Sequence, residues 1–315
     1  TRKTKPRPPL TTSSLQQDAS SRLRLSPSRT MSLSQQLFQG INLGNGEEGL
    51  ITYMRTDSTA LSSESLNEIG NFIQNSYGDD YFAQRKYKTT SANAQEAHEA
   101  IRPTSINRTP ESIKSFLDDD QYKLYDLIWK RTVSSQMSES ENKKTTIITI
   151  SSDEKYKFKS DYDELVFDGF KKLFPEKETE KMPNVSENDL VNLESIVKEQ
   201  KFTQHPPRYS EASLIKTMED LGVGRPSTYA SILNTIKEKK YVWVINRSIY
   251  LSPIGNVLVE EIKKDFSKEF MDYKFTEKME NDLDSISNGN LKRSEFVKSF
   301  WKNFEPIKKN YEKRS

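Results

Sequence analysis

The fold is decided by residues 210–240, which read SEASLIKTMEDLGVGRPSTYASILNTIKEKK. Apolar residues recur at helical spacing on both sides of the GVGRP turn, which predicts helices over 210–221 and 227–239. Pro226 suits the first helical turn, because the N–H that proline lacks has no partner there. Residues 241–252 alternate and predict two strands, so the whole unit is a helix-turn-helix with a wing.

Arg225 stands where the second of these helices begins. A helix N-terminus and a guanidinium group both favour phosphate, so this position predicts a nucleic-acid contact. Further positive charge lies nearby on Lys237, Lys239, Lys240 and Arg247. A helical hairpin with solvated lysines is the alternative that these features leave open.

Patterns elsewhere predict more helices, with strands in the middle of the chain. Helical spacing of apolar residues favours helices within 13–24, 28–39, 58–77, 111–137 and about the last sixty residues. Alternation predicts strands within 50–54, 145–174 and 190–202. The predicted fold class is therefore α+β and mostly helical.

The composition excludes several classes of protein. In 315 residues there is no Cys and there are only two His, which excludes disulfides, zinc ribbons, iron–sulfur clusters, a thiol nucleophile and a His-rich metal site. No apolar run approaches the length of about 18 residues that a membrane span needs. Hydrophobic residues make up only 33% of the chain, which predicts a high ratio of surface to core.

The first thirty residues permit two interpretations. They are basic, rich in Ser and nearly free of acids, with Asp18 as the one acidic residue. This composition is typical of an organelle transit peptide. It equally fits the basic face of a folded domain.

The segment ITYMRTDS, residues 51–58, combines a tyrosine with an arginine two positions later. In an extended segment both side chains emerge on the same face. A phenol with a pKa near 10 needs help to attack phosphorus, and Arg55 could supply positive charge to the phosphate oxygens. A tyrosine on an apolar strand is, however, usually part of a core or its rim.

The segment QEAHEAIRPT, residues 95–104, begins like the zinc-protease motif His-Glu-x-x-His. Its fifth position is Arg102, which excludes that metal site. His98 next to Arg102 fits either a structural histidine or a contact to a phosphate or nucleophile.

These three segments, together with LQQDAS at residues 15–20, resemble the bacterial type IA DNA topoisomerases (DNA topoisomerase I), in the same order along nearly the whole chain. The resemblance implies that Tyr53 attacks a single-strand phosphodiester and holds the 5′ phosphate. Strand passage and religation would then relax negatively supercoiled DNA. Arg55 would stabilise the scissile phosphate, His98 would assist at the tyrosine or phosphate, and Arg225 would contact the DNA strand.

The resemblance implies further DNA contacts at Thr52, Thr56, Asp57, Arg102, Ser213 and Gln35. Gln39 stands where many relatives carry Glu, so an ionised carboxylate has no counterpart there. The implied fold is an open toroid with three parts: a winged-helix-like domain bearing the tyrosine (1–138), a partial β-strand gate domain (139–202) and a helical helix-turn-helix DNA-binding domain (203–315).

The family also uses a Toprim domain whose Glu and Asp-x-Asp-x-Glu cluster hold Mg²⁺. Neither Asp161-Tyr-Asp163-Glu164 nor Asp282-Leu-Asp284 has this spacing, and both are interpreted as solvated acids. We therefore expect a fragment without the Toprim domain, the zinc ribbons or any metal ligand of its own. It should bind DNA without cutting it unaided. Because residues 1–30 align inside the family's folded region, the transit peptide becomes the weaker interpretation.

The resemblance further implies a monomer that binds single-stranded segments of underwound DNA, in the cytoplasm and associated with the nucleoid. Two alternatives stay open. A non-catalytic winged-helix DNA-binding module would give Tyr53 no role. A tyrosine recombinase would place its nucleophile after its Arg and His, whereas Tyr53 precedes His98 and Arg225, which argues against it.

Overall fold

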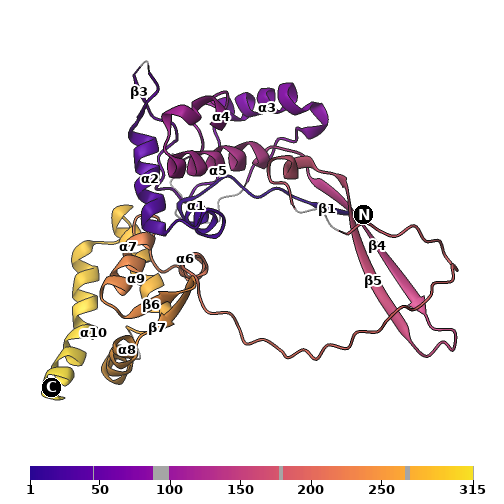
Figure 1. The fold of residues 1–315 in the computed structure, drawn as a ribbon. Coiled ribbons are helices and arrows are strands. Elements are labelled where there is room, and N and C mark those ends of the chain that lie inside the picture. Colours follow the sequence, from indigo (N-terminus) through magenta and orange to yellow (C-terminus); the bar gives the residue numbers. More distant parts are fainter. Residues whose placement is uncertain (45, 88–98, 177–179, 267–269, 315) are drawn as a thin grey trace. The chain divides into compact units, whose positions relative to one another are not determined.

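The computed structural model describes residues 1–44, 46–87, 99–176, 180–266 and 270–314 (Figure 1). The mostly helical α+β fold that the sequence predicts is confirmed. The chain divides into two compact units, each assembled from segments that are far apart in sequence. One unit contains Thr1–Pro8, Ser63–Arg85 and Lys130–Pro207, and the other contains Pro9–Ser62, Lys86–Trp129 and Arg208–Ser315.

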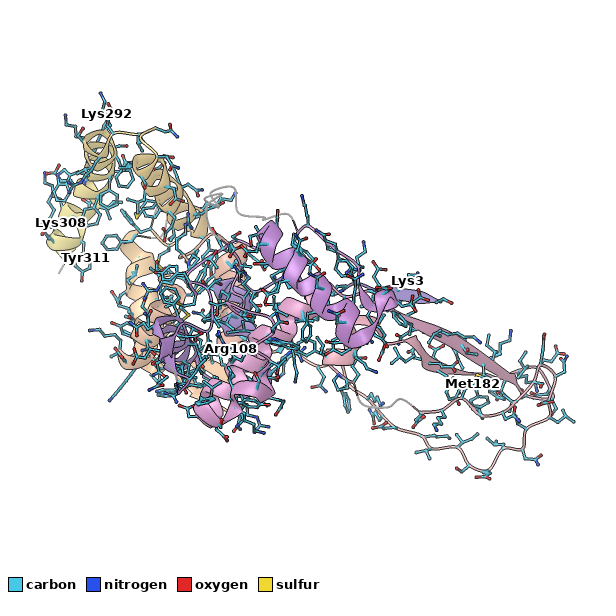
Figure 2. The ribbon with its side chains drawn as sticks, turned by 90° about the horizontal axis from the view of Figure 1, so that it is seen from above. Lys3, Arg108, Met182, Lys292, Lys308 and Tyr311 are labelled. Carbon is cyan, nitrogen blue, oxygen red and sulfur yellow. The ribbon has the colours of Figure 1, made fainter. Side chains whose placement is uncertain are left out.

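The first unit contains a long antiparallel hairpin. Strands β4 (Ser140–Ile150) and β5 (Lys157–Phe167) run side by side, and β1 (Arg2–Thr4) pairs with the start of β4 (Figure 1). Figure 2 labels Lys3 on β1, where its amine lies 2.5 Å from the carboxylate of Glu141. The strands predicted within 145–174 are thereby confirmed, with β4 beginning earlier than expected.

The strand predicted over 190–202 is wrong. This described stretch has no regular secondary structure, and Leu190 and Val197 are almost fully exposed. A strand needs a neighbour to accept its backbone hydrogen bonds, and the described residues pair none with it. The alternation of apolar and polar residues is therefore not sufficient here.

Helix α3 (Ser63–Tyr77) belongs to the same unit and buries Leu66, Ile69 and Ile73 along one face. Short 3₁₀ turns follow at Asp79–Tyr81 (η2) and Gly169–Leu173 (η4). The hydroxyl of Tyr81 donates to Asp168 at 2.7 Å, which ties the two turns together. This bond is the main cause that raises the pKa of Tyr81 to about 12.

The second unit begins with two helices. Helix α1 (Thr12–Asp18) continues into a π-helical turn, η1 (Ala19–Leu23), and α2 (Pro27–Gln39) starts after Ser26 caps the backbone of Arg29. Short elements follow: β2 (Ile41–Asn42), β3 (Glu47–Glu48), α4 (Pro110–Ile113), η3 (Lys114–Phe116) and α5 (Asp119–Ser135), which extends into the first unit. In place of the strand predicted over 50–54, only Ile51 pairs, with Pro103.

The winged unit follows, as predicted. Helices α6 (Glu211–Asp220) and α7 (Tyr229–Glu238) precede strands β6 (Val242–Ile245) and β7 (Ser248–Leu251). Its core contains Ile215, Met218, Tyr229 and Leu233. Helix α7 starts two residues later than predicted, after a turn in which the Thr228 hydroxyl accepts from the N–H of Arg225 at 2.8 Å and the N–H of Thr228 donates to the carbonyl of Arg225 at 2.8 Å.

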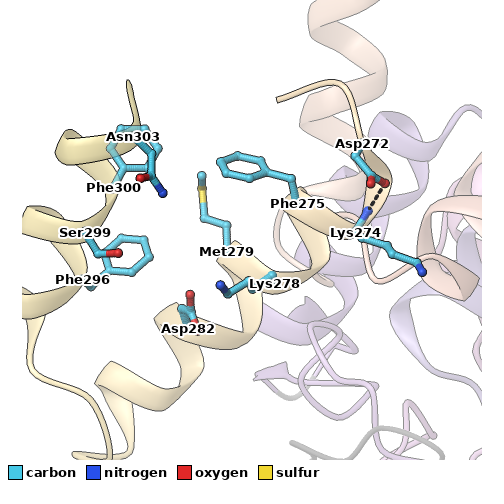
Figure 3. Close-up of a pocket in the computed structure, with 10 residues that line it drawn as sticks. All are labelled: Asp272, Lys274, Phe275, Lys278, Met279, Asp282, Phe296, Ser299, Phe300 and Asn303. Carbon is cyan, nitrogen blue, oxygen red and sulfur yellow. Dashed lines mark hydrogen bonds between the residues drawn. The ribbon is translucent and has the colours of Figure 1, made fainter. Parts of the chain in front are cut away.

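Three helices complete the second unit: α8 (Pro253–Phe266), α9 (Tyr273–Ser287) and α10 (Arg293–Arg314). Lys308 and Tyr311 project from α10 (Figure 2). A cavity of about 380 Å³ lies between α9 and α10, with Phe275, Met279, Phe296 and Phe300 around it (Figure 3). None of the described helices combines the length and apolar character needed to cross a bilayer.

Candidate functional site

The segment around Tyr53 alternates between buried and exposed side chains. Met54 and Thr56 are buried at 1% and 3% exposure, whereas Tyr53 is 46% exposed and Arg55 is also exposed. The two candidate catalytic side chains therefore emerge on the same side of the segment. Among the described residues, Arg55 has no hydrogen-bond or ion-pair partner, so its guanidinium group is available to an anion.

Helix α1 holds this segment from one side. The buried hydroxyl of Thr12 donates to the carbonyl of Met54 at 2.7 Å and accepts from the N–H of Thr56 at 2.9 Å. The N–H of Thr12 in turn donates to the carbonyl of Thr56 at 2.9 Å. These contacts fix the backbone on both sides of Arg55.

Residues 100–104 hold the segment from the other side. The hydroxyl of Thr52 donates to the carbonyl of Ala100 at 2.7 Å and accepts from the N–H of Arg102 at 3.0 Å. The N–H of Thr52 donates to the carbonyl of Arg102 at 2.9 Å. The motif that contains Tyr53 and the motif at residues 95–104, about fifty residues apart in sequence, are thus joined next to Tyr53.

The end of α2 supports the tyrosine ring. Phe38 packs edge-on against Tyr53 with ring centroids 5.4 Å apart. The chain passes α2 so closely that a Cβ at Gly49 would lie 2.7 Å from the carbonyl oxygen of Phe38. Only glycine permits this approach, which brings the chain from Leu50 onward into the site.

Arg102 is engaged within the protein. Its guanidinium group donates to Glu99 at 2.6 Å and to the carbonyl of Pro103 at 2.9 Å. Burial raises the pKa of Glu99, but the hydrogen bonds from Arg102 and Ser62 and the charge of Arg102 outweigh it and lower that pKa overall. A DNA contact by Arg102 stays a prediction. His98 lies outside the described residues.

In the winged unit, Arg225 is paired with helix α9. Its guanidinium group donates to Asp284 at 2.9 Å and to the carbonyl of Gly224 at 2.9 Å. Burial lowers the pKa of Arg225, but the hydrogen bond and charge of Asp284 raise it overall. The interpretation of Asp284 as a solvated acid is therefore wrong, because this carboxylate is only partly exposed and balances Arg225.

Tyr229 is a buried tyrosine on α7 of the winged unit. Burial, followed by the charge of Glu219, raises the pKa of Tyr229 to about 12, with Asp57 also raising it and Arg225 lowering it. Asp57 and Arg225 thus act on one buried phenol. The hydroxyl of Ser13 on α1 donates to Glu219 on α6 at 2.7 Å, which joins α1 to the winged unit.

Two other predicted contacts have local structural roles. Ser213 forms a capping box with Ser210: its N–H donates to the Ser210 hydroxyl at 3.1 Å and its own hydroxyl accepts at 2.8 Å. Gln35 is partly buried on α2. Neither observation tests a contact with DNA.

Within the described ranges, no three His, Asp or Glu side chains come together as metal ligands. Asp161, in one of the acidic stretches searched for this purpose, instead accepts from Thr146 at 2.6 Å and pairs with Lys144 at 3.0 Å. These bonds, with the Thr146 bond first, lower the pKa of Asp161 to about 2. The described residues therefore do not fit a Mg²⁺ site.

The matches to known proteins agree with this geometry. A family model described as DNA topoisomerase matches residues 1–298. The chain belongs to this family. DNA topoisomerase 1 of Rickettsia conorii is 42% identical over 308 residues, which covers 95% of this chain and 40% of that relative. DNA topoisomerase 1 of Xylella fastidiosa is 41% identical over 319 residues, which covers 97% of this chain and 39% of that relative.

Among solved structures of the DNA topoisomerase family, full-length topoisomerase I from Thermotoga maritima matches with a TM-score of 0.84 and 36% identity. The match covers 97% of this chain and 50% of that one. The chain thus spans about 40% of the length of the curated relatives it matches.

Sequence reasoning missed four residues that shape this candidate site: Thr12, Phe38, Glu99 and Asp284. Only Glu99 left a usable signal, because it stands three residues from Arg102. Thr12 and Asp284 contact their partners from 42 and 59 residues away, which local patterns do not reveal.

Proposed function

We propose that this chain supplies the nucleophile and the DNA-holding surface of a type IA DNA topoisomerase, which relaxes negatively supercoiled DNA. The observation that carries the proposal is the exposed Tyr53–Arg55 pair on a backbone fixed from both sides. A fixed backbone favours catalysis because it holds the reacting atoms in place before the substrate arrives.

In the proposed reaction, the Tyr53 Oη attacks the phosphorus of a single-strand phosphodiester. A new O–P bond forms, the bond to the 3′ oxygen breaks, and the 3′ oxygen takes up a proton. The phenol proton passes to a base, with His98 as the proposed helper, and Arg55 stabilises the phosphate oxygens. After another strand has passed the gap, the 3′ hydroxyl attacks the phosphotyrosine and the reaction reverses.

The remaining predicted residues divide by the environment in which they stand. Thr52 and Thr56 position the backbone through their own hydrogen bonds, which supports an indirect role at the phosphate. Asp57, Arg102, Ser213, Arg225 and Gln35 are the proposed strand contacts. We propose the same three functional parts, 1–138, 139–202 and 203–315, acting as a monomer on single-stranded segments of nucleoid DNA in the cytoplasm.

In this proposal, the Mg²⁺ ion that the reaction needs is held by another domain. The described residues do not fit a Mg²⁺ site, so a Toprim domain outside this chain would have to hold the ion. We therefore expect DNA binding by this chain alone, without autonomous cleavage.

The test is to incubate the chain with a single-stranded oligonucleotide, with and without an added Toprim domain and Mg²⁺. A covalent protein–DNA adduct should form only when both are added, and Tyr53→Phe should abolish it, a loss of at least about 1000-fold. Tyr156→Phe, which alters another exposed tyrosine, is the control and should leave the adduct unchanged. An adduct that survives Tyr53→Phe would show that the nucleophile is another residue.

A second candidate is a non-catalytic DNA-binding module. The observation in its favour is the winged unit, which has a core of its own. That candidate predicts oligonucleotide binding with no adduct in any combination of domain and metal, and binding that is unchanged by Tyr53→Phe.

A further inference from the structure

The wing hairpin has two different faces. Antiparallel register pairs Trp243 with Tyr250, and Val244 with Ile249. Ile249 packs against the core of the winged unit. Because successive side chains on a strand point to opposite faces, Trp243 and Tyr250 lie together on the face directed away from that core. Trp243 is 49% exposed.

The guanidinium group of Arg208 packs on the ring of Tyr250. The Cζ atom of Arg208 lies 4.4 Å from the centre of the Tyr250 ring. The neighbouring carbonyl of Tyr209 accepts from the N–H of Ile249 at 2.7 Å, so the chain at 208–209 runs beside β7. Arg208 thus lies over the Tyr250 ring, and Trp243 is the cross-strand neighbour of Tyr250; we call these three residues the wing platform.

Cations stand in the segments that border the wing platform. Arg247 stands in the two-residue turn of the hairpin, where both Asn246 and Arg247 have positive φ. Lys239 and Lys240 lie in the short link before β6. In the part of the chain that the structure describes, the side chains of Arg208, Lys239, Lys240 and Arg247 make no ion pair. The platform therefore combines flat rings with uncompensated positive charge.

We propose that the wing platform binds single-stranded nucleic acid, with an unpaired base stacked on the exposed ring of Trp243 and the phosphates held by Arg208, Lys239, Lys240 and Arg247. Aromatic rings beside a basic surface suit this ligand, since every base has a π-face and every linkage a negative charge. A second copy of the chain fits less well, because two such faces would bring their cations together. The proposal deepens the proposed function and rests on it, as it names the surface that holds the strand.

The test compares Trp243→Ala with Trp301→Ala, which removes a tryptophan of nearly equal exposure from α10. Affinities are measured for a short oligothymidylate and for an abasic oligonucleotide of the same length. Trp243→Ala should weaken oligothymidylate binding about ten-fold and leave abasic binding unchanged. Trp301→Ala should leave both affinities unchanged. Equal losses in the two variants, or an equal loss on the abasic strand, would overturn the proposal.

A second measurement leaves the platform intact. In Trp301→Phe protein, Trp243 is the exposed tryptophan, since Trp129 is buried. Its fluorescence should be quenched by oligothymidylate and not by the abasic strand, because stacking requires a base. Absence of quenching at saturation would refute stacking. Self-association that Trp243→Ala abolishes would instead assign the face to a second copy.

These outcomes are separate from a failure of the proposed function. If the chain forms the Tyr53 adduct but Trp243→Ala binds normally, only the wing platform is refuted. If the unaltered chain binds no oligonucleotide, both proposals fail together.

Discussion

The segment around Tyr53 and the β4–β5 hairpin are ordered in different ways. The hairpin pairs its backbone continuously from Asn142 to Ile150, yet most of its large apolar side chains are exposed. The Tyr53 segment pairs at a single position, but the buried Thr12 hydroxyl bonds its backbone at Met54 and Thr56, and its own Thr52 hydroxyl bonds the backbone of residues 100–102. Backbone pairing alone forms a strand, whereas buried hydroxyl groups that fix neighbouring backbone atoms can present a reactive side chain in one position.

The substitution Thr12→Val tests this difference most directly. It keeps the shape of the side chain but leaves the carbonyl of Met54 and the N–H of Thr56 without the hydroxyl that they contact. We expect a loss of about 2–4 kcal/mol in the free energy of unfolding, measured by urea denaturation. The matched change in the hairpin, Thr146→Val, should lie within experimental error, because its hydroxyl bond is exposed.

Equal effects of these two substitutions would contradict the comparison. They would show that the exposed hydroxyl of Thr146 and the buried hydroxyl of Thr12 contribute equally to the free energy of unfolding.

The second prediction concerns Tyr229, whose burial raises its pKa from 10.0 to about 12. The folded state favours the neutral phenol, so the stabilisation is fully present below pH 10 and is lost as the pH rises from 10 to 12. Between pH 9 and 12, the free energy of unfolding of the unaltered protein should fall by up to about 2 kcal/mol more than that of the Tyr229→Phe variant. Urea denaturation of both proteins over this range measures the difference, and parallel curves would contradict it.

The smallest expected effect comes from Asp284→Asn, which removes the charge that balances Arg225. Affinity for a single-stranded oligonucleotide should rise about two- to five-fold at low salt, since a partly exposed pair contributes little. The affinity should also fall more steeply with salt, by up to about 0.7 in the log–log slope. Asp282→Asn is the control, because it makes the same charge change on the same helix. An equal response of both variants would show that only net charge matters.

The sequence predicted those parts of the fold that depend on local spacing. Both helices and both strands of the winged unit lie within one or two residues of their predicted positions, because local spacing and the turns between them mark each element. The strand predicted over 190–202 failed because alternation does not supply a pairing partner. Helix α7 begins later than predicted, after a turn in which both the hydroxyl and the N–H of Thr228 bond the backbone of Arg225.

The candidate site was predictable in its residues but not in its supports. Tyr53, Arg55 and Arg225 could be named from their segments, and their roles stay predictions. Their partners could not be named, because Thr12 and Asp284 act across long stretches of chain. Glu99 changes the expectation for Arg102, since it engages the guanidinium group that was expected at DNA.

The long-range bonds of Thr12 and Thr52 also set the order in which the contacts around Tyr53 can form during synthesis. Thr12 bonds to Thr56 across 44 residues, and Thr52 bonds to Arg102 across 50 residues. At about 5–20 residues per second, a ribosome needs about 3–10 s to add the residues between Thr52 and Arg102. During that interval Tyr53 has been added to the chain, but the contacts that fix the backbone beside it are incomplete. The nascent chain thus gains an aimed tyrosine only after both flanking segments have been made.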